Sequence, residues 1–133
     1  MCYYLYGNID VTAYNEDFFK VCDKFNIPHN KLYDYDIELK SKIKPKGVFF
    51  RLTDNHCDCN SSIGSEKINN KELTNYLNWL TALKKYRDIN YVYIFKRWSD
   101  DIIDTKITIH FDNIDNRYLA DMKENTFYRI QLL

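Results

Sequence analysis

Apolar residues recur along the chain with two different periods, and these periods predict its strands and helices. Alternation of apolar and polar residues, or a short unbroken apolar run, is typical of a strand, and apolar residues three and four apart are typical of a helix. The expected strands are residues 3–9, 33–39, 48–53, 91–95, 106–111 and 127–132. The expected helices are residues 15–26, residues 69–87 and a short helix between residues 115 and 124.

Two of these elements have the clearest patterns. The helix over residues 69–87 has an apolar stripe made of Leu73, Tyr76, Leu77, Leu80 and Leu83. Asn69 and Glu72 are spaced for a reciprocal cap at its start. The run from Tyr91 to Phe95 is almost entirely apolar, which predicts a strand that is buried on both faces.

The order of the elements predicts the fold class. Strands 91–95 and 106–111 are separated by the polar segment 99–104, which we interpret as the turn of a hairpin. Local hairpins mixed with helical crossovers indicate an α+β fold. We expect a single globular domain over residues 1–133: a mostly antiparallel sheet with two main helices packed on one face and a short third helix. The strand 33–39, which alternates with acidic residues, is expected at an edge where a partner protein could add a strand.

Composition and charge limit the classes of partner that we expect for this chain. The chain has 133 residues with 19 Lys and Arg against 19 Asp and Glu, a formal net charge of zero. A neutral chain has no overall field that attracts nucleic acid or an anionic membrane, so neither is an expected partner. The sequence contains no apolar run long enough to span a bilayer, and its first residues do not resemble a signal peptide. We therefore expect a cytoplasmic protein.

The segment His56-Cys57-Asp58-Cys59 is the most unusual part of the sequence. It places three potential soft-metal ligands within four residues, and clustered cysteines in a reducing compartment are typical of thiols or metal ligands rather than disulfides. Zinc is the candidate cofactor. The pair is closer than the spacing of two to four residues usual for zinc sites, so other ligands are needed. Cys2 is the best candidate for a further ligand, because it lies outside every periodic pattern of apolar residues and packing does not account for it. His110 is the alternate ligand.

Other interpretations of these residues stay open. One is a loop of unligated cysteines in which His56 forms a hydrogen bond with the backbone. A redox role ranks below metal binding because Cys-x-Cys lacks the two-residue spacer of dithiols at helix starts. Cys22 lies on the apolar stripe of the first helix, so we expect it to be a buried small hydrophobic residue.

Two functions follow from these observations. Twelve Tyr, together with Trp79 and Trp98 as candidates for exposed rings, favour a small binding or inhibitory protein that acts through a Tyr-rich surface. Two classes of protein have this size and kind of composition: inhibitors that mobile elements encode, and immunity proteins that neutralise toxins. The alternative is a small thiol- or zinc-dependent enzyme that uses the loop from His56 to Cys59. The absence of a recognisable catalytic constellation favours binding over catalysis.

Overall fold

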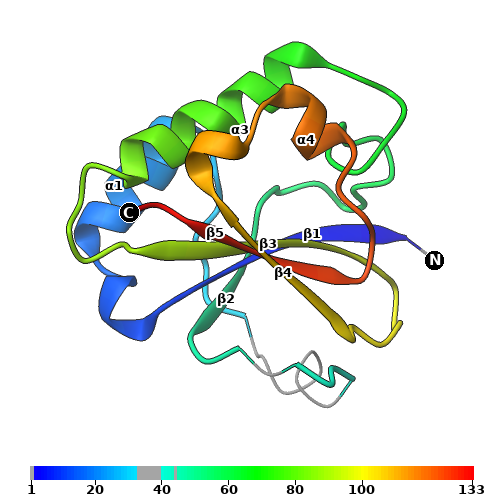
Figure 1. Ribbon diagram of the computed structural model, residues 1–133, viewed down its shortest axis with the longest axis horizontal. Helices are drawn as coiled ribbons and strands as arrows, with labels where there is room; N and C mark the ends of the chain where they lie inside the picture. The colour runs from blue at the N-terminus through cyan, green and yellow to red at the C-terminus, as the bar shows by residue number, and fades with distance from the viewer. Residues whose placement is uncertain (1, 33–39, 44) are drawn as a thin grey trace.

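The computed structural model describes residues 2–32, 40–43 and 45–133, in which a five-stranded sheet carries three α-helices (Figure 1). The strands are β1 (Tyr3–Ile9), β2 (Val48–Arg51), β3 (Tyr91–Trp98), β4 (Thr105–His110) and β5 (Thr126–Gln131). The helices are α1 (Glu16–Lys24), α3 (Asn70–Leu83) and α4 (Asn116–Ala120), with short 3₁₀ turns η1 (Val11–Ala13) and η2 (Phe111–Asn113). The α+β class expected from the sequence is confirmed.

The sheet has the strand order β2-β1-β3-β5-β4. All neighbouring pairs are antiparallel except β4 and β5, which are parallel. The apolar strand β3 occupies the centre and is buried along most of its length, as its composition predicts. Tyr6 of β1 pairs with Arg51 of β2, so the end of β2 and the beginning of β1 lie at the same end of the sheet.

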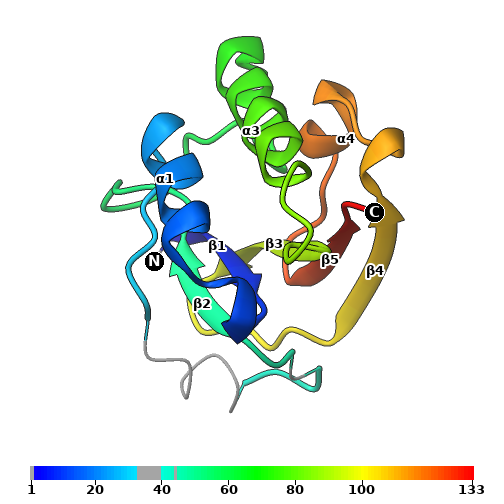
Figure 2. The ribbon, with the colours of Figure 1, turned by 90° about the vertical axis from the view of Figure 1, so that its left-hand side faces the viewer.

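The helices α1, α3 and α4 all lie on one side of the sheet (Figure 2). Their shared core contains fully buried side chains from helices and strands, among them Phe18, Leu73, Trp79 and Leu80. Gly7 of β1 is required here, because a Cβ atom at this position would lie 2.3 Å from the ring of Phe50. The stripe predicted on α3 is therefore the face that packs against the sheet.

The opposite face of the sheet carries a smaller aromatic core. Phe49, Phe95 and Phe127 are buried there, and Phe95 contacts the other two edge to face. Tyr93 and Ile103 complete the cluster. Ile103 also joins Ser41 in an isolated parallel bridge. The sheet thus has apolar packing on both faces, and the helices α1, α3 and α4 cover one of them.

The structure differs from the sequence prediction in one strand connection and in the burial of one tryptophan. The prediction that β3 and β4 form a hairpin is wrong, because β5 lies between these strands. The segment 99–104 instead leads from β3 to β4 at the far edge of the sheet. Trp79, expected to be exposed, is fully buried in the core, whereas Trp98 is partly exposed. The strand expected over residues 33–39 lies outside the described residues.

Candidate metal centre

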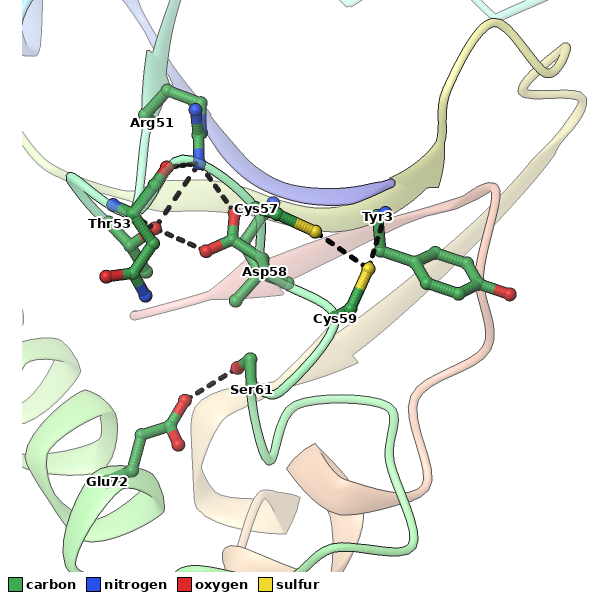
Figure 3. A network of polar contacts seen from close by, with 10 residues as sticks. Tyr3, Arg51, Thr53, Cys57, Asp58, Cys59, Ser61 and Glu72 are labelled. Atoms are coloured by element: carbon green, nitrogen blue, oxygen red, sulfur yellow. Dashed lines mark hydrogen bonds and ion pairs between the residues drawn. The ribbon is translucent and has the colours of Figure 1, made fainter. Parts of the chain in front are cut away.

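The loop that follows β2 and leads to α3 carries the cysteine pair. Because β1 and β2 are antiparallel, this loop leaves the sheet beside the first residues of β1. The amide of Asp58 donates a hydrogen bond to the carbonyl of Tyr3 at 2.9 Å, which joins the middle of the loop to β1. Sequence positions more than fifty residues apart thus meet at one end of the sheet (Figure 3).

Three thiols converge at this place. The sulfur atoms of Cys2, Cys57 and Cys59 all lie within 4.8 Å of one another. The Sγ atoms of Cys57 and Cys59 are 2.8 Å apart. Cys59 is exposed, while Cys2 and Cys57 are half-buried, so the group is open to solvent on the side of Cys59.

Asp58, between the two loop cysteines, anchors the loop in the protein. The residue is 1% exposed, and its carboxylate accepts hydrogen bonds from the amide of Leu5 at 2.8 Å and from Nη2 of Arg51 at 2.7 Å. The hydroxyl of Thr53 donates a further bond to this carboxylate. A buried carboxylate requires such partners, so Asp58 fixes the direction in which its neighbours Cys57 and Cys59 point.

The second half of the loop is held by α3. Asn69 caps the helix by accepting from the amides of Lys71 and Glu72, as expected. The reciprocal bond from Glu72 is not formed, because its carboxylate instead accepts from the hydroxyl of Ser61 at 2.6 Å and the amide of Ser62 at 3.2 Å. The first turn of α3 therefore binds the cysteine loop rather than closing its own cap.

Hydrogen bonds from the backbone and from nearby side chains hold the residues of the thiol group. The amide of Tyr3 lies 3.4 Å from Sγ of Cys59 and donates to it. Cys2 is held by Ser99, whose amide donates to the Cys2 carbonyl at 2.8 Å and whose hydroxyl accepts from the Cys2 amide at 3.3 Å. Partial burial and the nearby sulfur of Cys2 raise the pKa of the Tyr4 hydroxyl, which therefore stays protonated beside that sulfur.

A cleft of about 800 Å³ opens beside Cys59 and is lined by Tyr3, Lys67, Lys96 and Lys123, among others. Lys96 is only 6% exposed and donates to the carbonyls of Ile63 and Gly64, with its ammonium group 4.6 Å from the centre of the Tyr3 ring. Burial lowers the pKa of Lys96. The cleft also contains the carboxylates of Glu66 and Glu124, so charges of both signs lie near the exposed thiol.

The predicted ligands fall into two sets. Cys2, Cys57 and Cys59 come together, whereas His56 is exposed in the same loop and does not belong to the group of converging atoms. The alternate His110 caps η2, where Nδ1 accepts from the amide of Asp112 and Nε2 donates to the carbonyl of Leu133 at 2.7 Å. These two hydrogen bonds hold His110 at the C-terminal end of β4, so it lies outside the thiol group.

Some residues that build the site were missed from the sequence. Asp58 and Glu72 hold the loop, and Lys96 lines the adjacent cleft. A carboxylate between two cysteines is a weak signal for an anchor, and nothing in the pattern of β3 distinguishes Lys96 from a solvated strand residue. The expectation for Cys22 is confirmed: it is fully buried, and burial raises its pKa to about 12, so it is an inert thiol.

Comparisons with known proteins do not identify a relative. No protein-family model, no curated protein and no solved structure matches the chain. Within the described residues, no helix combines the length and the apolar character that crossing a membrane requires. The functional argument therefore depends on the geometry of the thiol group and its surroundings.

Proposed function

We propose that the protein binds a thiophilic metal ion, with zinc as the first candidate, through Cys2, Cys57 and Cys59. One observation carries the proposal: sulfur atoms from two distant segments lie within 4.8 Å of one another. Zinc binds thiolates at about 2.3 Å with tetrahedral geometry, which corresponds to sulfur separations of roughly 3.8 Å. The 2.8 Å between Cys57 and Cys59 and the upper limit of 4.8 Å for the group each differ from this separation by about 1 Å.

The way the loop is anchored supports this proposal. Asp58 and Glu72 hold the backbone on both sides of Cys59 without using any of the three thiols. The thiols are thus placed together by contacts that remain when the ligands are deprotonated for metal binding. The amide of Tyr3 donates to Cys59, and such outer contacts orient a ligand and stabilise its negative charge.

Three protein ligands leave a fourth position on a tetrahedral ion. In catalytic zinc sites this position holds water or substrate, which corresponds to the zinc-dependent enzyme left open by the sequence. His56 is the nearest candidate from the sequence for a fourth protein ligand, because it precedes Cys57 and is exposed. A His56→Ala variant separates these cases: weaker binding indicates a closed site, and unchanged binding an open one.

The test is metal binding by the purified protein. Protein purified without chelator should contain one zinc per chain, and Co²⁺ should give the absorption bands of thiolate ligation. Cys2→Ser, Cys57→Ser and Cys59→Ser should each weaken binding by more than the ~10–100-fold typical of losing an outer contact. Cys22→Ala also removes one thiol but should keep full affinity. A protein that neither retains zinc nor shows these bands contradicts the proposal.

A role in protein binding is a second and separate proposal. It is supported by the half-buried rings of Tyr4 and Tyr6, which lie under the guanidinium group of Arg51 at 5.0 and 5.9 Å. Tyr and Arg are the residues that contribute most often to binding energy at interfaces. A partner bound by the wild type and lost by a Tyr4→Ser/Tyr6→Ser variant supports this role, and retention of that partner contradicts it.

A further inference from the structure

We propose that Cys57 and Cys59 form a redox-active dithiol that exchanges with small disulfides of the glutathione class. This activity goes beyond metal binding and does not require a metal. It uses two of the three thiols of the candidate metal centre, so the disulfide and the bound metal exclude each other.

The geometry of the pair favours closure. The sulfur atoms are 2.8 Å apart, and reaching the ~2.05 Å of a disulfide takes a movement of less than ~1 Å. Figure 3 shows the Asp58 carboxylate turned toward Arg51 while the two sulfurs face each other. Because the bonds of Asp58 fix the peptide between the cysteines, the loop keeps its position when the disulfide forms.

Exposure assigns different roles to the two thiols. Cys59 is exposed and lines the cleft of about 800 Å³, so it is the sulfur that an incoming disulfide meets first. Cys57 is half-buried behind it and is placed to resolve the intermediate. The amide of Tyr3 donates a hydrogen bond to Sγ of Cys59, and the cleft beside this sulfur is wide enough to admit a small disulfide.

The reaction consists of two exchange steps. The Cys59 thiolate attacks a glutathione disulfide, forming a mixed disulfide and releasing one glutathione thiolate. The Cys57 thiolate then attacks Sγ of Cys59, closing the Cys57–Cys59 disulfide and releasing the second glutathione thiolate. The protons lost by the two cysteine thiols are taken up by the released thiolates. The protein dithiol is oxidised by two electrons and the glutathione disulfide is reduced.

The disulfide formed in this way is suited to reversal. A ring that spans one intervening residue removes little chain entropy, so the bond contributes little to stability. Exposed and strained disulfides are the ones that are readily reduced. Cys2 remains as a free thiol within 4.8 Å of the pair. The role of this bond is therefore chemical rather than structural.

The experiment uses metal-free, reduced protein in glutathione buffers of increasing oxidation. Free thiols are then blocked by alkylation, and the products are identified by mass and peptide mapping. We expect Cys57 and Cys59 to lose alkylation together as one disulfide, while Cys2 stays alkylated. Buried Cys22 stays unmodified in the folded protein and reports any unfolding.

Three variants test the assigned roles. Cys57→Ser should accumulate a mixed disulfide on Cys59, and Cys59→Ser should react with glutathione disulfide at least about tenfold more slowly. Cys2→Ser should close the disulfide like the wild type. Full alkylation of both loop thiols in oxidised buffer, or a disulfide from Cys2 to the loop, overturns the proposal.

The outcomes also separate this inference from the proposed metal site. A protein that retains zinc through three thiols but never closes the disulfide overturns the redox proposal alone. A protein that closes the disulfide but whose Cys2→Ser variant binds zinc as tightly as the wild type overturns the three-thiol site alone.

Discussion

Helix α3 and the cysteine loop that precedes it are neighbours in the sequence, but different forces hold them in place. One face of α3 is buried against the sheet through Leu73, Leu80 and Leu83, all fully buried. The loop instead is fixed by hydrogen bonds to the carboxylates of Asp58 and Glu72. Burial of apolar surface is not directional, whereas hydrogen bonds require particular partners at particular angles.

This difference separates stability from the arrangement of the site. An apolar stripe tolerates small shifts as long as its area stays buried. Three sulfurs that are to hold one ion need positions accurate to a fraction of an ångström. The directional contacts of the loop provide that accuracy. The helix contributes buried apolar surface to the core of the surrounding fold.

The largest expected effect is on the helix side of this comparison. Leu80→Ala removes a fully buried side chain and should lower the free energy of unfolding by ~2–5 kcal/mol, measured by urea denaturation. Metal affinity of the folded variant should stay unchanged, because Leu80 lies about two helical turns beyond Glu72 in α3. A loss below ~0.5 kcal/mol would show that the stripe on α3 is not a core face.

A smaller effect on stability, with a larger effect on the site, is expected for Asp58→Asn. The amide keeps the size of the carboxylate but loses the charged bond to Arg51, which should cost ~1.5–3 kcal/mol. Zinc affinity should fall by at least ~10-fold, because the loop thiols lose their fixed positions.

The matched control for this variant is Asp54→Asn, an exposed acid in the same loop. It should change the free energy of unfolding by less than ~0.5 kcal/mol and leave zinc affinity unchanged. Equal losses of zinc affinity in both variants would contradict a special role for Asp58 and point to a general effect of loop charge.

The smallest effect concerns pH and the buried thiol of Cys22. Burial raises its pKa from 9.0 to about 12 in the folded protein, so the unfolded state loses the proton first as pH rises. The stability linked to this group is full below pH 9 and decreases as pH rises toward 12. Between pH 8 and 10 the wild type should lose up to ~1.4 kcal/mol more than Cys22→Ala in urea unfolding. Parallel curves for the two proteins would show that Cys22 ionises as freely as in water.

Much of the fold could be predicted because its signals are local. The stripe on α3, the apolar run of β3 and the inert Cys22 each follow from neighbouring residues. They are buried as expected, except that Leu77 and Tyr91 are only partly buried. Which strands lie side by side in the sheet was harder to predict from the sequence. The segment 99–104 has the composition of a turn, but β4 and β5 are parallel and joined through α4, so β5 takes the place beside β3.

The sequence by itself determined the periods of apolar residues, and with them the elements, the α+β class and which residues of α3 form the core. It also marked the cysteine loop as unusual. The tertiary structure decided that Cys2 lies beside Cys57 and Cys59, that His110 caps η2 instead, and that Trp79 is buried. The physical reason is that periodicity reports on residues a few positions apart, whereas the thiol group depends on antiparallel pairing of β1 with β2 and on the buried bonds of Asp58.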